Sequence, residues 1–458
     1  MASESSDLLA PLDLAFWSIE SPAHPMHLGA LGVFDAAAPS AAAHAAELLA
    51  ARAAAVPGLR LRIRHVLLPP GGAQRQAAPG FDPLDHVRLA PPADDFQAAA
   101  GALMQRPLER DRPPWEAHVL PGADGGRFAV LFKFHHALAD GLRALTLAAA
   151  VMDPVELPPG REPCPRPEPP WWHALDPRRL PGAVVSTVRS AVADVGQALD
   201  IGAAVTRATW GVRSSAALTA RPTGTRRTAG VVLDLDDVHR VRKAVGGTVN
   251  DVLIAVVAGA LRRWLDERGD GSAGVAPRAL IPVSRRRPRS AQPQGNRLSG
   301  YLVRLPVDDP APLGRLGAVR AAMDRNKDAG PARGAGAVAL LADRVPPLGH
   351  RVGGPAVAHG ARLLFDLLVT SVPLPSLGLR LGGCPLVEVY PFAPLARGHA
   401  LAVAVSTYRG RVHFGLLADA VAVPDLEGLA RCVAAELGEL VEACGSLAGA
   451  PRTRPFPN

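Results

Sequence analysis

A proline-rich stretch at the end of the first third of the chain constrains its fold more than any other feature. Residues 154–170 read PVELPPGREPCPRPEPP. Prolines at this density exclude a continuous helix and a central β-strand, because proline lacks the backbone N–H and fixes φ. The 458-residue chain is also too long for one ordinary hydrophobic core. We therefore predict an N-terminal domain at residues 1–153, a crossover linker at 154–225 and a C-terminal domain at 226–458.

Apolar patterning predicts short strands and helices in both domains. Strand-like segments lie at 28–34, 128–134, 302–307, 400–406 and 412–417, and helix-like segments at 41–53, 142–152, 250–262 and 425–442. In the linker, apolar residues at helical spacing predict a long helical segment at 180–218. Alternating strands and helices favour an α/β or α+β fold with two layers per domain. Ligand sites in such chains tend to lie between the domains.

Charge and cysteine content restrict the partners and the compartment. The formal net charge of +8 favours phosphate-bearing ligands or acidic membrane surfaces. Scattered arginines and an aromatic content of 4% argue against nucleic acid as a partner. The cysteines form no CxxC pair and suit a reducing cytoplasm. They are Cys164, Cys384, Cys432 and Cys444.

The sequence also predicts how the chain relates to membranes. Its first residues lack the basic and apolar segments of a secretory signal, and no apolar run approaches the roughly 18 to 20 residues of a membrane span. We expect a cytoplasmic protein that is soluble or peripheral at a surface. The segment 180–218, preceded by Trp171 and Trp172, suits packing on protein as well as docking on lipid.

Two adjacent histidines follow a predicted strand, and alternation assigns them to opposite faces. Residues 128–136 read FAVLFKFHH. Successive side chains of a strand point to opposite sides. His136 continues the apolar face of Phe128, Val130, Phe132 and Phe134, whereas His135 continues the face of Ala129, Leu131 and Lys133. We therefore expect His136 to point towards the core or a cavity, and His135 to point the other way.

The residues after the histidines indicate how their loop is held. A neutral imidazole with a pKa near 6.5 can take a proton from a hydroxyl, which suits His136 as a general base. Asp140 can cap the following helix or pair with an arginine, so we assign it as a structural brace. Gly141 permits a tight turn. Adjacent histidines on opposite faces do not converge on one ion, so no metal is expected. Spacing alone leaves a structural role for the pair open.

Several motifs, taken in chain order, resemble the bacterial wax ester synthase/diacylglycerol acyltransferase family. The family's HHxxxDG pattern matches His135, His136, Asp140 and Gly141. Ser371 stands where the family usually has asparagine, and Pro114 stands where it usually has leucine. The other matching segments are PLDLAFW at 11–17, MHLG at 26–29, RPPWE at 112–116, ND at 250–251, GN at 295–296 with Ser299 and LP at 305–306, TSVP at 370–373, and the block at 391–425.

This resemblance implies a fold, a reaction and a set of substrates. The fold would be two chloramphenicol acetyltransferase-like domains with mixed sheets flanked by helices and a tunnel at their interface. His136 would deprotonate a lipid hydroxyl that attacks acyl-CoA directly, with His135 in support. Acyl-CoA would be a substrate, and no bound cofactor is implied. Asn250, Asn296 and Ser299 are candidates for binding substrate or stabilising the oxyanion. An ordinary helix N-cap is an equal alternative for Asn250.

The resemblance also implies partners and leaves alternatives. The leading prediction is triacylglycerol synthesis from diacylglycerol, with wax esters from a fatty alcohol as a second product, at the inner membrane or lipid droplets. The arginines of residues 285–289 (RRRPR) could contact CoA phosphates, or could form a solvated loop. One alternative is a condensation-type enzyme that acylates another alcohol or an amine, although no carrier domain is visible. Another is a non-catalytic lipid-binding homologue, which the intact HHxxxDG run disfavours.

Overall fold

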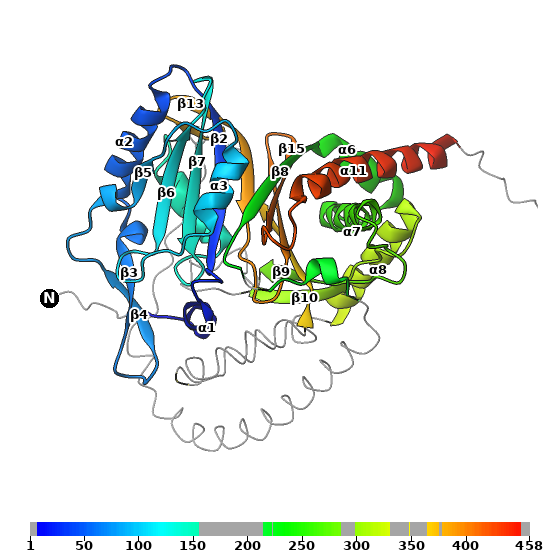
Figure 1. Cartoon of the computed structure of the whole chain (residues 1–458), viewed down its shortest axis with the longest axis horizontal. Coiled ribbons are helices and arrows are strands. Elements are labelled where there is room, and N and C mark those ends of the chain that lie inside the picture. Colours follow the sequence, from blue (N-terminus) through cyan, green and yellow to red (C-terminus); the bar gives the residue numbers. More distant parts are fainter. Residues whose placement is uncertain are drawn as a thin grey trace, which may run out of the picture.

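The computed structural model describes residues 7–154, 214–221, 223–284, 298–329, 348, 364–374 and 378–449. Two six-stranded mixed sheets lie side by side at the centre of the molecule, and helices flank them (Figure 1). One sheet is built mainly from the first half of the chain and the other from the second. The predicted α/β class with two mixed sheets is confirmed.

The N-terminal sheet has the strand order β12-β13-β2-β7-β6-β5, and only β5 and β6 run parallel. Helices α2 and α4 pack on one face of this sheet and α3 packs on the other. The strands are β2 (His27–Asp35), β5 (Val87–Leu89), β6 (Trp115–Pro121), β7 (Arg127–His135), β12 (Arg380–Leu381) and β13 (Cys384–Phe392), and the helices are α2 (Ala41–Ala53), α3 (Phe96–Met104) and α4 (Gly141–Ala150).

The C-terminal sheet has the order β10-β9-β11-β14-β15-β8, in which β11 runs parallel to both of its neighbours. Four helices cover its outer face, and its inner face packs against α3 and the N-terminal sheet (Figure 1). The strands are β8 (Arg227–Asp234), β9 (Arg278–Ser284), β10 (Leu298–Arg304), β11 (Leu367–Pro373), β14 (Leu401–Tyr408) and β15 (Arg411–Ala418), and the helices are α6 (Leu235–Val245), α7 (Val249–Glu267), α8 (Pro312–Ala329) and α11 (Leu426–Gly449).

Sheet membership does not follow chain position completely. Strands β12 and β13 come from the second half of the chain, yet β13 pairs antiparallel with β2, from Leu386 opposite Phe34 to Phe392 opposite Gly29. The two sheets also touch where β13 crosses β15. A Cβ on Gly415 would lie 1.9 Å from the carbonyl oxygen of Pro391, so only glycine permits this approach. The division at residues 154 and 225 stays a prediction.

A small third sheet supports the N-terminal segment. Its order is β1-β4-β3, with β3 and β4 forming a hairpin. Helix α1 packs against it through Leu14 and Trp17, which share a buried cluster with Ile63, Ala73 and Ala137. These elements are β1 (Asp7–Leu8), α1 (Pro11–Ile19), β3 (Leu61–His65) and β4 (Ala73–Ala77), and single turns of 3-10 helix lie at Pro57–Arg60, Pro83–Asp85 and Ala216–Leu218.

Most predicted elements agree with the observed ones to within a few residues. Helix α7 is longer than predicted, because its apolar residues are buried on every side rather than on one stripe. The strand predicted at 302–307 begins earlier, at Leu298, and ends at Arg304. Of the helical segment predicted at 180–218, residues 180–213 lie outside the described residues. Within the described residues, no single helix is both long enough and apolar enough to cross a membrane.

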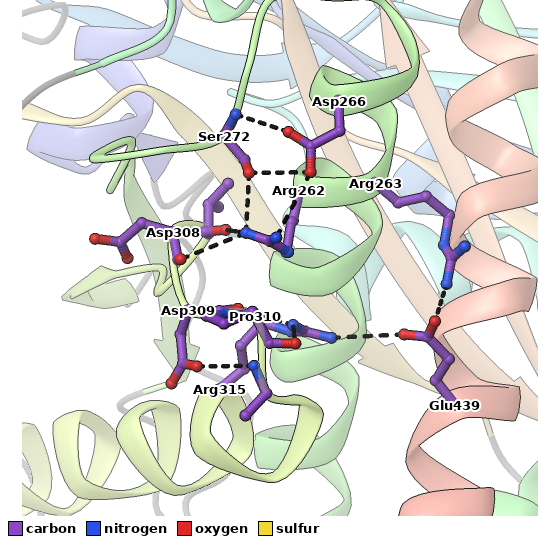
Figure 2. A network of polar contacts seen from close by, with 11 residues as sticks. Arg262, Arg263, Asp266, Ser272, Asp308, Asp309, Pro310, Arg315 and Glu439 are labelled. Carbon is purple, nitrogen blue, oxygen red and sulfur yellow. Dashed lines mark hydrogen bonds and ion pairs between the residues drawn. The ribbon is translucent and has the colours of Figure 1, made fainter.

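A partly exposed polar network, shown in Figure 2, joins three helices of the outer layer around the buried Arg315. Arg315 of α8 donates to the Glu436 carboxylate of α11 at 2.6 Å, and both side chains are buried. Arg315 also donates to the carbonyl oxygens of Asp309 and Pro310. On α7, Arg263 pairs with Glu439. Because a buried charge is costly unless it is paired, these contacts specify how the helices dock.

Candidate active site

A cavity of about 310 Å³ lies between the two sheets, with α4 along one side. Strands β2, β7 and β13 contribute from the N-terminal sheet, and β9, β11 and β14 contribute from the C-terminal sheet. Most of its described lining residues are apolar, so the cavity suits an acyl chain or another lipid tail. The polar residues among them are His136, Asp140, Thr370, Ser371 and Ser406.

His136 follows the last residue of β7 and lines this cavity beside Phe132 and Phe134. Its backbone N–H donates to the carbonyl oxygen of Met26 at 2.8 Å. The Phe16 ring stacks on the imidazole with a centroid distance of 4.2 Å. Burial lowers the pKa of His136 below its ordinary 6.5, although Asp13 and Asp140 act in the other direction. A neutral imidazole therefore faces the cavity near pH 7.

His135 points to the opposite side of the strand, as predicted, but this side is buried too. The Ala137 N–H donates to its Nδ1 at 3.0 Å, so the proton of the neutral ring resides on Nε2. That Nε2 lies 3.4 Å from Oε2 of Glu20, and the Trp17 ring meets the imidazole edge-on. His135 is thus held in the protein interior and does not line the cavity.

Glu20 is the central acceptor behind the histidine pair, and sequence reasoning missed it. One carboxylate oxygen accepts from the Met26 N–H at 3.0 Å, and the other accepts from Nε of Arg110 at 3.1 Å. Burial alone would raise the pKa of Glu20, but His135, the Met26 N–H and Arg110 outweigh it and lower the pKa to about 2. The ionised carboxylate therefore connects His135 to Met26, whose carbonyl oxygen accepts from the backbone N–H of His136.

A second buried ion pair holds the loop just after the histidines. Nη2 of Arg75 donates to Oδ2 of Asp13 at 2.6 Å and to the carbonyl oxygen of Ala137 at 2.7 Å. Both side chains are almost wholly buried. Asp13 lies in the PLDLAFW segment of α1, but a lone arginine in β4 gave no sequence signal. Helix α1 and the small sheet thus brace the histidine loop from one side.

Asp140 and Gly141 brace the loop from the other side. Oδ1 of Asp140 accepts from the Arg143 N–H at 2.8 Å, so Asp140 is the N-cap of α4, which is one of the two roles that the sequence predicted for it. The tight turn predicted at Gly141 is not observed, because Gly141 is the first residue of α4. A Cβ there would lie 3.2 Å from Cγ2 of Val372, so glycine lets β11 approach the helix.

Comparisons with known proteins identify the family. Residues 9–253 match the wax ester synthase/diacylglycerol acyltransferase catalytic domain, and residues 294–441 match the C-terminal domain of the same family. A probable diacylglycerol O-acyltransferase of Mycobacterium tuberculosis is 33% identical, covering 96% of this chain and 100% of the relative. A second one from the same organism is 30% identical, covering 94% and 95%. The chain belongs to the wax ester synthase/diacylglycerol acyltransferase family.

Solved structures show the same fold. The wax ester synthase/diacylglycerol acyltransferase of Marinobacter aquaeolei VT8 aligns with a TM-score of 0.70 at 23% identity, covering 96% of this chain and 100% of that one. Trichothecene 15-O-acetyltransferase of Fusarium sporotrichioides aligns with a TM-score of 0.59 at 11% identity, covering 94% of each. A mutant starter condensation domain of rhizomide synthetase in complex with C8-CoA aligns with a TM-score of 0.51 at 15% identity, covering 97% and 95%.

Of the predicted oxyanion candidates in this family member, only Asn250 has a described side chain, so the roles of the other two stay predictions. Asn250 is not among the described residues that line it. Nor is Asn250 the helix cap: Thr248 caps α7 and forms a reciprocal capping box with Asp251. Ser299 lies in β10 with its backbone opposite Val283. Asn296 and the arginine run 285–289 lie outside the described residues.

Strand β11 contributes two polar residues to the lining of the same cavity. Thr370 and Ser371 line the cavity, and they belong to the TSVP segment in which serine replaces the usual asparagine. The Ser406 hydroxyl also lines the cavity but donates to the carbonyl oxygen of Val389 at 2.9 Å. Its hydrogen is therefore committed to the contact between β14 and β13.

Proposed function

We propose that the chain transfers the acyl group of acyl-CoA to the free hydroxyl of diacylglycerol, forming triacylglycerol, and that fatty alcohols serve as a second class of acceptor. The observation that carries this proposal is a neutral imidazole, His136, at the wall of an apolar cavity between two sheets. The names of the mycobacterial relatives support the choice of diacylglycerol. The likeness to a condensation domain holding C8-CoA supports a thioester donor.

The proposed reaction needs no acyl-enzyme. His136 takes the proton of the acceptor hydroxyl while its oxygen attacks the thioester carbonyl, forming the C–O bond and a tetrahedral oxyanion. As this intermediate collapses, the C–S bond breaks and the imidazolium returns the proton to the departing CoA thiolate. The products are the ester and free CoA, and His136 is neutral again for the next cycle.

The surrounding residues have supporting roles in this proposal. Asp13 with Arg75, Glu20 with His135, and the Asp140 cap position the loop but do not touch the reacting atoms. A developing oxyanion needs a hydrogen-bond donor. Thr370 is the best-placed described side chain, since it lines the cavity and lies on the same face of β11 as Leu368, which packs between the two sheets.

The proposal is tested by presenting the purified chain with palmitoyl-CoA and either dioleoylglycerol or hexadecanol. CoA release and the lipid product are followed separately, by thiol titration and by chromatography. The proposal predicts CoA release matched by triacylglycerol, with wax ester as a slower product. CoA release with only an amine acceptor would favour a condensation-type enzyme. Binding of both lipids without any CoA release would favour a lipid-binding protein.

A further inference from the structure

The tip of the β3–β4 hairpin carries two leucines that are exposed in the part of the chain that the structure describes. Leu67 is 94% exposed and Leu68 is 80% exposed, the two highest values among the large hydrophobic side chains of the described residues. Pro69 and Pro70 follow them and complete an apolar turn. Single exposed leucines are common, but two adjacent ones at a projecting tip indicate a surface that meets an apolar partner.

The charges around this tip have one sign. No aspartate or glutamate occurs between Glu47 and Asp82. Arg60, Arg64 and His65 are exposed on or beside β3. Arg75 of β4 is different, because its side chain is buried and paired with Asp13. An apolar tip with cationic flanks is the pattern of segments that enter the headgroup layer of an anionic bilayer.

The hairpin also lies close to the candidate active site. At its base, Arg75 pairs across the strands with Ile63 and donates to Ala137 in the histidine loop. The tip is four to five residues beyond Ile63, which corresponds to about 15 Å along a strand. In Figure 1 the hairpin reaches down past α1, away from the two large sheets. A surface in contact with the tip would therefore lie near the loop that carries His136.

We propose that the β3–β4 hairpin docks the protein on anionic phospholipid bilayers by inserting Leu67 and Leu68 into the headgroup layer, with Arg60 and Arg64 contacting lipid phosphates. The inference that the bilayer also supplies the lipid acceptor rests on the proposed function, whereas the docking itself does not. A bilayer fits better than a protein partner, because a stable protein interface buries about 800 Å² on each side and the tip offers little more than two side chains.

Vesicle flotation tests the docking without reference to activity. The full-length chain is mixed with phosphatidylcholine vesicles that contain or lack phosphatidylglycerol, and the bound fraction is measured. The double variant Leu67→Ser/Leu68→Ser should lower the partition coefficient about tenfold or more, and Arg64→Glu should lower it about fivefold or more on anionic vesicles only. The matched control is Val421→Ser, since Val421 is 68% exposed but lies in the C-terminal half.

Each outcome decides the proposal. Wild-type flotation of the double leucine variant, or equal loss in the Val421→Ser control, would overturn docking by the hairpin. Self-association of the wild type without lipid, abolished in the double variant, would assign the tip to a second copy of the chain instead. Circular dichroism and Arg64→Glu guard against a folding defect. Normal flotation without CoA release would leave the docking intact and reject the proposed reaction.

Discussion

The two adjacent histidines are both buried, but they lie on opposite faces of the strand and have different surroundings. His136 faces a cavity and stacks on Phe16, while Nε2 of His135 lies 3.4 Å from the buried Glu20 carboxylate. The strand period predicted this division from sequence, because alternation depends only on local geometry. The partners of the histidines were not predictable in the same way. Glu20, Arg110 and Arg75 are isolated charges without periodicity, and only the tertiary fold brings them to the loop.

The rate of acyl transfer should fall on acidification with an apparent pKa below 6.5. Burial lowers the pKa of His136, so the imidazole stays neutral through the pH at which an ordinary histidine gains a proton. The base is present above its lowered pKa and is lost as the pH falls through it. Measuring kcat/KM for acyl-CoA from about pH 5 to about pH 9 checks this, because kcat/KM reports the ionisation of the free enzyme. An acidic limb centred above pH 7 would contradict the account.

Replacing Glu20 by glutamine should reduce kcat about tenfold and change the pH profile, with little effect on the KM for acyl-CoA. The amide removes the negative charge that holds His135 and the Met26 backbone. Glu116→Gln is the matched control, because this carboxylate is also held ionised, with a pKa of about 2, but it pairs with His118 and Lys133. Both variants are compared by kcat, KM and pH profile. If Glu20→Gln has the same kcat and pH profile as Glu116→Gln, Glu20 does not position the histidine loop.

At the scale of secondary structure, local signals predicted most elements but not their partners. Helix α2 and strand β7 have strong apolar patterns and agree with the predicted ranges within a residue or two. The transfer of β13 into the N-terminal sheet was not predictable, because strand pairing over more than 300 residues leaves no local pattern. The N-cap of α7 was not predictable either, because Thr248 and Asn250 can both cap a helix. In the structure Thr248 is the cap, in a capping box with Asp251.

Gly415→Ala should destabilise the protein by about 1 to 3 kcal/mol, because the added methyl group collides with the Pro391 carbonyl and forces β13 away from β15. Gly438→Ala in α11 is the control, since a Cβ there meets nothing within 4 Å. That substitution should be neutral or slightly stabilising, as alanine favours a helix. Urea unfolding measures both. Equal free energies of unfolding for Gly415→Ala and wild type would show that the sheets are not in such close contact.

On the scale of the whole molecule, several buried neutral histidines should make the fold acid-sensitive. Burial lowers the pKa of His27 to about 3, of His24 to about 4 and of His413 to about 4. The unfolded chain binds these protons near pH 6.5 and the folded chain does not. Stability is therefore retained above that pH and is lost progressively as the pH falls towards 4.

At pH 4, each of these histidines should lower the free energy of unfolding by about 1 to 3 kcal/mol relative to pH 7.5. The free energy of unfolding, measured by urea titration at pH 7.5 and pH 5 (about one unit or more either side of 6.5), should show this loss. His413→Leu should reduce the pH dependence of the free energy of unfolding, because burial lowers the pKa of this histidine. A pH dependence that is unchanged in His413→Leu would mean that this histidine is charged in the folded protein.

The general-base role of His136 is tested most directly by comparing His136→Ala with His135→Ala under saturating palmitoyl-CoA and dioleoylglycerol, with the folding of each variant checked by circular dichroism. The account predicts that His136→Ala lowers kcat by a factor of about 100 to 10,000, whereas His135→Ala causes a smaller loss through disordered positioning. A folded His136→Ala protein that retains near-normal turnover, or a larger loss in His135→Ala, would contradict it.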